Sequence, residues 1–285
     1  MRLAGAPISW GVCEVPGWGY QLPPELVLAQ MRELGLTATE FGPPGFLPAD
    51  PAGRAAILGR HQLTAAGGFL AVVLHERAAD PAGQVQRALA EFAAAGGDVL
   101  VLAAATGRAG YEARPELDSQ GWATLLDSLD RAVALAAQAG LTVTLHPHVG
   151  TMIERRDEVH RVLDGSSIGL CLDSGHLLIG GTDPAELARQ VPGRIAHTHL
   201  KDVDGGWARR VRDGETSYAA AVAAGLYRPL GTGDADIAGL VGALAAAGYD
   251  GWYVLEQDTV LSGEPDGPGP QGDVRASIAY LQGLP

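Results

Sequence analysis

The chain has 285 residues, of which 47% are hydrophobic and 19% charged, a composition that supports a sizeable buried core and excludes a disordered chain. Its 20 Lys and Arg against 33 Asp and Glu give a formal charge of −13, which disfavours nucleic acid as a partner. Because there are only two cysteines and no apolar run of about 20 residues, we expect a cytoplasmic protein without a membrane partner.

Eight short apolar runs alternate with helical patterns rich in alanine and leucine. The predicted strands are Leu3–Ser9, Thr37–Phe41, Phe69–His75, Asp98–Ala103, Leu141–Pro147, Ile168–Asp173, Ile195–Lys201 and Gly251–Glu256. The predicted helices are Pro24–Leu34, Pro51–Ala65, Pro81–Ala95, Gly121–Ala139, Arg156–Leu163, Pro184–Gln190, Ile237–Ala247 and Asp273–Leu281. Apolar runs without polar alternation indicate strands covered on both faces, so the pattern predicts a single (β/α)8 TIM barrel domain over residues 1–285. A doubly wound sheet is disfavoured because Trp10–Glu14, after the first strand, is not a glycine-rich phosphate loop.

Polar and glycine residues mark the ends of several predicted helices. An aspartate precedes the first-turn proline of three helices and is expected to cap their free N–H groups, at Asp50, Asp80 and Asp183. Glycine is expected in the left-handed conformation after three helices, at Gly35, Gly140 and Gly248. Between the seventh strand and its helix we predict a long loop over residues 204–227. Such a loop carries substrate contacts in barrel enzymes, and a solvated insertion or an oligomer contact is the alternative.

Histidine is concentrated at the predicted strand ends. Six of the eight histidines lie at or just after such an end: His75, His146, His148, His176, His197 and His199. Barrel active sites form at the C-terminal ends of the strands, so this distribution indicates a functional site. His197 and His199 point to the same side of their strand, which leaves one of them as a ligand and the other as a supporting or core residue. A structural role is favoured for His75.

Carboxylates end the late predicted strands in the same way. Apolar residues lead directly into Asp173 and Glu256, and into the His199-Leu200-Lys201-Asp202 run. A buried carboxylate needs a counter-charge, which a divalent cation supplies. Imidazole together with carboxylate suits Mn, Co, Fe or Zn better than Ca or Mg. The sequence therefore predicts a metal site that includes Asp173, His199 and Glu256.

These motifs resemble those of a known superfamily. Leu172-Asp173-Ser174-Gly175-His176, His199-Leu200-Lys201-Asp202 and Glu256 resemble the xylose-isomerase-like barrels, which include sugar isomerases, sugar epimerases and endonuclease-IV-type enzymes. The runs Ala6–Glu14, Glu40–Pro43 and His146–Thr151 resemble its inosose (2-keto-myo-inositol) dehydratase branch. The resemblance covers nearly the whole chain.

The resemblance implies one divalent metal, commonly Mn or Co, with Zn or Fe as alternatives. Three ligands of the superfamily match Asp173, His199 and Glu256, which follow strands six, seven and eight. The fourth ligand is usually a glutamate after strand five, where this chain has His146, and His148 is the other candidate there. A neutral imidazole can still bind metal, so His146 completes the expected ligand set.

The implied activity is the dehydration of inosose, a cyclic polyol ketone. Removal of an α-proton gives an enediolate, and the β-hydroxyl then leaves as water. The candidates for proton transfer are Glu256, His176 and Lys201, and binding of a substrate oxygen is the alternative role of Lys201.

The candidate substrate contacts come from the first, second and fifth strand ends and from the long loop. They are Trp10, Glu14, Glu40, His148 and Arg212. The Trp10 ring either packs at the barrel rim or forms a wall against a sugar-like substrate ring. Glu40 either contacts the substrate or caps a helix. A small polyol or sugar is the expected partner, and by analogy with the family the chain is expected to form a homo-oligomer.

Three other functions compete with dehydration. A sugar isomerase or epimerase acts on a ketose through the same enediolate, but His146 replaces one of the two opposed glutamates that exchange protons in epimerases. A phosphodiesterase needs a basic face, which the charge of −13 disfavours. A non-catalytic barrel needs no ligands at successive strand ends, and metal analysis distinguishes it.

Overall fold

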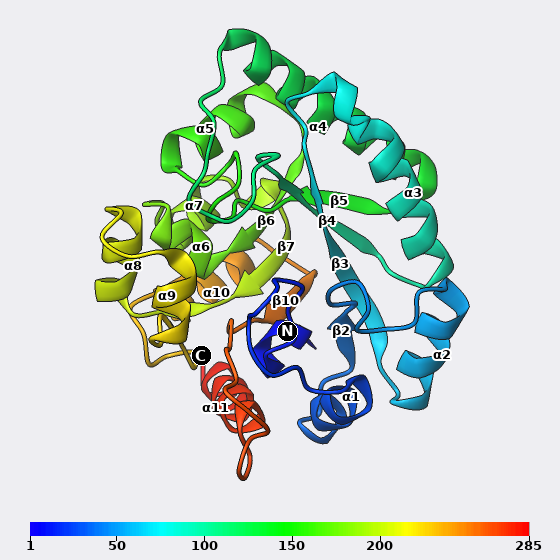
Figure 1. Ribbon diagram of the computed structural model, residues 1–285, viewed down its shortest axis with the longest axis vertical. Helices are drawn as coiled ribbons and strands as arrows, with labels where there is room; N and C mark the ends of the chain where they lie inside the picture. Colours follow the sequence, from blue (N-terminus) through cyan, green and yellow to red (C-terminus); the bar gives the residue numbers. More distant parts are fainter. Residues whose placement is uncertain (285) are drawn as a thin grey trace.

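Eight parallel strands form a closed barrel ringed by helices in the computed structural model, which describes residues 1–284 (Figure 1). The barrel strands are β1 (Arg2–Gly5), β2 (Ala38–Glu40), β3 (Thr64–Val72), β4 (Val99–Ala104), β5 (Thr142–Leu145), β6 (Gly169–Asp173), β7 (Ile195–Leu200) and β10 (Trp252–Leu255). Neighbours in the barrel follow the chain order, and β10 pairs with β1 to close the ring. The prediction of a single (β/α)8 barrel is confirmed. Pro285, the last residue of the expected domain, lies outside the described residues.

Helices connect successive strands and cover the outside of the barrel. They are α1 (Pro24–Glu33), α2 (Pro51–Arg60), α3 (Pro81–Ala94), α4 (Ser119–Ala139), α5 (Arg156–Gly165), α6 (Ser174–Ile179), α7 (Pro184–Gln190), α8 (Gly205–Arg212), α9 (Tyr218–Ala223), α10 (Ile237–Ala246) and α11 (Pro270–Gln282). Three short 3₁₀ helices are η1 (Pro7–Trp10), η2 (Arg77–Ala79) and η3 (Pro192–Arg194). Within residues 1–284, no helix combines the length and the apolar character that a bilayer crossing requires.

The predicted helix caps are present. Asp50, Asp80 and Asp183 accept hydrogen bonds from the N–H groups of Gly53, Gly83 and Glu186 at 2.7, 3.2 and 2.9 Å. The three expected left-handed glycines have φ of 83°, 69° and 76°, at Gly35, Gly140 and Gly248. Local sequence therefore sets where these helices begin and end.

Several predicted boundaries are wrong. The third strand was expected over Phe69–His75, but it runs from Thr64 to Val72. The first strand was expected to reach Ser9, but it ends at Gly5 because Pro7 begins the 3₁₀ turn η1. The second predicted helix was expected to reach Ala65, but it ends at Arg60. Gln62 then takes a φ of 55°, which turns the chain so that β3 begins at Thr64.

The segment predicted as a long loop over residues 204–227 is folded instead. Strands β8 (Asp202–Val203) and β9 (Tyr227–Arg228) pair antiparallel and enclose α8 and α9, which lie beside α6 (Figure 1). Asp204 caps α8 by accepting hydrogen bonds from two of its N–H groups, and Ser217 caps α9. Buried alanine and valine side chains hold both helices against the barrel. The loop prediction is corrected to a helical insertion.

Alternate strand residues fill the inside of the barrel. Small side chains of β1, β2 and β3 pack with Trp252 and Val254 of β10, while Cys171 of β6 packs with valines of β4. Side chains on a strand alternate between its faces, so the next inward positions are Asp173 after Cys171 and Glu256 after Val254. The apolar interior of the barrel is therefore followed, at the C-terminal ends of the strands, by a layer of acidic side chains.

Candidate active site

A cavity of about 490 Å³ opens at the C-terminal ends of the barrel strands. Its wall includes Glu14, Trp18, Glu40, Phe69, His146, His148, His199, Lys201, Glu256 and Asp258. This volume lies in the range of small-molecule sites, about 300–1,000 Å³. Its place at the strand ends is the place where TIM barrels carry their active sites.

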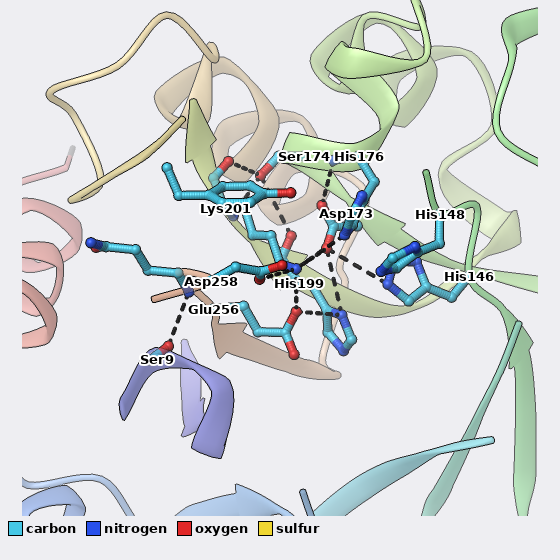
Figure 2. Close-up of polar contacts among 12 residues, drawn as sticks. Ser9, His146, His148, Asp173, Ser174, His176, His199, Lys201, Glu256 and Asp258 are labelled. Carbon is cyan, nitrogen blue, oxygen red and sulfur yellow. Dashed lines mark hydrogen bonds and ion pairs between the residues drawn. The ribbon is translucent and has the colours of Figure 1, made fainter. Parts of the chain in front are cut away.

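His199 and Glu256 line this cavity, and Asp173, which is fully buried, meets them behind its wall (Figure 2). One potential ligand atom of each lies within 4.8 Å of the others. His199 Nδ1 is 3.1 Å from Glu256 Oε2 and 3.6 Å from Asp173 Oδ2. Three strand ends that are distant in the sequence therefore place one imidazole and two carboxylates around a shared centre.

The surroundings of this centre fit a divalent cation. Asp173 Oδ1 accepts a hydrogen bond from the backbone N–H of His176, whereas Asp173 Oδ2 is buried and accepts no hydrogen bond from the described residues. Four side-chain carboxylates lie in this buried region: Glu40, Asp173, Glu256 and Asp258. Two cationic groups lie among them in the metal-free protein, the Lys201 ammonium and the imidazole of His199. Burial alone lowers the pKa of His199, but Cys171, Glu256 and Glu40 raise that pKa well above its ordinary value. Buried negative charge in such excess needs a counter-charge. The imidazole and carboxylate donors suit Mn, Co, Fe or Zn.

His146 is nearer to this centre than His148. His146 Nε2 is 3.8 Å from Asp173 Oδ2, and its ring lies 5.0 Å from the ring of His199. His148 stacks on His176 with ring centroids 3.7 Å apart. Its Nδ1 lies 2.7 Å from the backbone oxygen of Val149, so Nδ1 carries the proton and Nε2 is the lone-pair nitrogen of the neutral ring. The geometry favours His146 as the strand-five member of the metal set.

Burial keeps these two histidines neutral. Burial, together with His199, His148 and Lys201, holds the pKa of His146 well below its ordinary value. Burial and the Lys201 ammonium likewise lower the pKa of His148. Neutral imidazole is the form that binds metal or accepts a proton.

Lys201 is buried among carboxylates. Its Nζ is 2.7 Å from Asp258 Oδ1, 3.0 Å from Glu256 Oε2 and 3.6 Å from Asp173 Oδ2. Burial alone lowers the pKa of a lysine, but these carboxylates raise the pKa of Lys201 well above its ordinary value. Lys201 is therefore a charged donor that faces the cavity, and it does not act as a base at neutral pH.

Glu40 joins the two histidines of β7. Its Oε1 accepts hydrogen bonds from His197 Nε2 at 2.9 Å and from His199 Nε2 at 3.0 Å. Burial raises the pKa of Glu40, but His199 and His197 outweigh it and lower that pKa, so the carboxylate stays charged. With Nε2 committed to Glu40, His199 presents Nδ1 to Asp173 and Glu256. His197 is the supporting residue of the pair, and Glu40 does not cap a helix.

His176 lies behind His148 rather than in the cavity wall. Its side chain is 1% exposed, and its Nε2 is 3.2 Å from Lys201 Nζ. Burial, with His148 and Lys201, holds the pKa of His176 well below its ordinary value. His176 therefore contacts Lys201, which lines the cavity, but is not itself a wall residue. His75, by contrast, pairs with Glu76 at 3.6 Å, in keeping with a structural role.

The structure brings three of the five predicted substrate contacts to the cavity and corrects the other two. Glu14, Glu40 and His148 line the wall. Trp10 is 0% exposed and its Nε1 donates to Gln30 Oε1 at 2.8 Å, because η1 turns the ring into the core, where it contacts α1. The Arg212 side chain lies on the outer surface of α8, 40% exposed and 3.8 Å from Asp213. Neither Trp10 nor Arg212 is a wall residue.

Sequence reasoning missed other residues of this site. Asp258 lies two residues after Glu256, and period-two alternation could have identified it. Phe69, at the start of the third predicted strand, is 40% exposed because its ring forms part of the cavity wall. Tyr218 of α9 donates to Asp258 Oδ2 at 2.6 Å, a contact that no local pattern predicts.

Comparison with known proteins decides the family. Residues 20–284 match the family model described as the xylose isomerase-like TIM barrel. The chain belongs to this family. The resemblance found in the strand-end motifs is thereby confirmed.

Relatives of this xylose isomerase-like barrel include named enzymes. The chain is 30% identical to an inosose dehydratase of Geobacillus kaustophilus, and the match covers 90% of this chain and 87% of that protein. Also over 90% of its length, it is 31% identical to the rhizopine catabolism protein MocC of Rhizobium meliloti, with 82% of that protein covered.

Solved structures share the fold at lower identity. A D-allulose 3-epimerase from Methylomonas sp. in complex with D-allulose superposes with a TM-score of 0.72 at 16% identity, over 100% of this chain and 97% of that one. A probable 3-DHS dehydratase from Bacillus anthracis gives 0.71 at 15% identity, with 100% of both chains covered. The IOLI protein with a bound zinc atom gives 0.69 at 14% identity, over 100% and 98%. Dehydratases and epimerases thus share this barrel.

Proposed function

We propose that this barrel is a metal-dependent carbon–oxygen lyase that dehydrates inosose or a closely similar cyclic polyol ketone. The observation that carries the proposal is the convergence of Asp173, His199 and Glu256 beside the charged Lys201, at the wall of a cavity of about 490 Å³. The names of the sequence relatives support inosose as the substrate.

The proposal includes one divalent cation held by His146, Asp173, His199 and Glu256. Mn or Co is the proposed metal, with Zn or Fe as alternatives, because the donors are imidazole nitrogens and carboxylate oxygens. When bound, the cation supplies Lewis acidity that polarises the substrate carbonyl. A cytoplasmic location is part of the same proposal and is supported by the two free cysteines.

Two different residues of the chain carry out the two proton transfers. His148 is neutral and lines the cavity with Nε2 as its acceptor, so we assign to it the removal of the α-proton. The electron pair left on carbon then expels the β-hydroxyl. Lys201 is charged and faces the same cavity, so its Nζ donates the proton with which the hydroxyl leaves as water. Glu256 contacts both Lys201 Nζ and His199 Nδ1, so it fixes the position of Lys201 relative to the proposed metal ligands.

The decisive experiment incubates the full chain with Mn²⁺ and inosose and follows the ultraviolet absorbance of the dehydrated diketone. Rising absorbance that depends on Mn²⁺ is expected. No diketone, together with inversion of a ketose carbon, would replace the dehydratase by an epimerase.

A deuterium experiment separates the roles of the two residues. In D₂O, Lys201→Met is expected to exchange the α-hydrogen of inosose while forming little diketone, because only the leaving-group proton is lost. His148→Gln is expected to abolish both exchange and diketone formation. Exchange that survives in His148→Gln would assign the base to another residue.

A further inference from the structure

Lys201 and a divalent cation need the same carboxylates. Lys201 Nζ is 3.0 Å from Glu256 Oε2 and 3.6 Å from Asp173 Oδ2, and these two oxygens also face His199 in the proposed metal set. Two positive charges in one buried pocket repel each other. An ammonium that rested fully on Glu256 and Asp173 would therefore oppose metal binding.

Asp258 gives the ammonium a partner outside the metal set. The contact of Lys201 Nζ with Asp258 Oδ1 at 2.7 Å is shorter than its contacts with Glu256 and Asp173 (Figure 2). Asp258 is 9% exposed, so water competes little for this carboxylate. A short, charge-assisted hydrogen bond of this kind holds an ammonium in place.

Tyr218 fixes the other oxygen of Asp258. The Tyr218 hydroxyl donates to Asp258 Oδ2 at 2.6 Å and lies 2.9 Å from the hydroxyl of Tyr227. Tyr218 is 2% exposed, and its ring lies 4.9 Å from that of Tyr111. Both carboxylate oxygens of Asp258 are thus bonded, and the side chain cannot swing with Lys201 toward the metal set.

The anchor comes from the helical insertion rather than from the barrel. Tyr218 is the first residue of α9, which lies in the chain between β8 and β9 and packs against α8. Helix α8 in turn packs against α6. Tyr218 brings the insertion to Asp258, and Tyr227 of β9 lies beside the Lys201 ammonium, with its ring centroid 5.2 Å from Nζ.

We propose that Asp258, held by Tyr218, is a positioning residue that keeps the Lys201 ammonium beside the metal site and out of it. The inference rests on the proposed metal site. It predicts that loss of Asp258 weakens metal binding because Lys201 then moves onto Glu256 and Asp173.

The test measures Mn²⁺ binding to the metal-free full chain by titration calorimetry. Asp258→Asn is expected to weaken binding by about tenfold, a coupling common among contacting charged groups. If the loss acts through Lys201, it must disappear when the lysine is absent. The double variant Asp258→Asn/Lys201→Met is therefore expected to bind Mn²⁺ within about threefold of Lys201→Met alone.

A charge control separates positioning from simple loss of a negative charge. Glu14→Gln removes one acidic group from the same cavity wall, and we expect it to change Mn²⁺ affinity by less than about threefold. Tyr218→Phe keeps the carboxylate of Asp258 and removes only its anchor. A loss of about threefold is expected there, again abolished by Lys201→Met, and this variant serves if Asp258→Asn fails to fold.

The outcomes are distinct. Equal loss of affinity from Asp258→Asn with and without Lys201 overturns the positioning role, as does unchanged affinity in both single variants. If the unaltered chain binds none of Mn²⁺, Co²⁺, Zn²⁺ and Fe²⁺ in the same titration, the metal site of the proposed function is refuted, and this inference with it.

Discussion

Glu256→Gln removes one negative charge from the site while keeping the shape of the side chain. Glu256 Oε2 lies 3.0 Å from Lys201 Nζ and 3.1 Å from His199 Nδ1. At an effective dielectric constant of about 20, each contact between unit charges carries about 5 kcal/mol of direct attraction. The dehydration of both partners offsets most of it. Lys201 also keeps Asp258 at 2.7 Å, so no buried ammonium is left unpaired.

We therefore expect Glu256→Gln to lower the free energy of unfolding of the metal-free protein by only about 1–3 kcal/mol. For a chain of this size that is a fall in Tm of about 2–6 °C. The effect on the reaction is larger, because the amide is a poor metal ligand and carries no charge. We expect kcat with inosose to fall about 10³-fold at saturating Mn²⁺.

The assay combines thermal unfolding followed by circular dichroism with turnover of inosose at saturating Mn²⁺. Glu264→Gln, the same change at an exposed position outside the cavity, is the matched control and leaves both measurements unchanged. A folded Glu256→Gln protein with turnover within threefold of the unaltered chain would falsify the role of Glu256.

Four further predictions follow from the site and the fold. Chelation of the metal abolishes turnover, and Mn²⁺ added at a hundredfold excess over its Kd raises the free energy of unfolding by about 2.7 kcal/mol; equal melting with and without Mn²⁺ contradicts this. Burial holds the pKa of His176 well below 6.5, so its contribution to the stability of the metal-free protein is complete above that pH and is lost as the pH falls below it. Denaturation at about pH 5 to 8 checks this, and His176→Asn reduces the slope by up to about 1.4 kcal/mol per pH unit. Trp10→Phe costs about 1–3 kcal/mol of stability without changing the KM, whereas Phe69→Ala raises the KM; steady-state kinetics and melting separate the two. Asp183→Ala lowers the free energy of unfolding by about 1 kcal/mol through loss of the α7 cap, and denaturant titration measures it.

The parts of the fold that were predicted correctly depend on local sequence. Unbroken apolar runs mark the barrel strands because both faces of a parallel sheet are covered, and Asp–Pro pairs such as Asp183-Pro184 mark helix starts. The helical insertion was missed because α9 is only six residues long and its alanines carry no distinctive period. Its order comes from packing against α8 and the barrel, which sequence patterns do not report.

The candidate site was predictable where strand alternation determines it. Asp173, His199 and Glu256 occupy inward positions that follow apolar residues, so their convergence follows from barrel geometry. Trp10 was misplaced because a 3₁₀ turn, rather than a continued strand, decides which way its ring points. Tyr218 could not be foreseen, since its contact with Asp258 spans 40 residues and depends on the tertiary position of α9.

The closure of the barrel sets when this chemistry can first exist during synthesis. β10 joins β7 to β1, and the residues that follow it deliver Glu256 and Asp258 to the centre. A nascent chain that has emerged only through β7 presents Lys201 and Asp173 without either of these acids. The proposed cation site is therefore complete only after the last strand has joined the barrel.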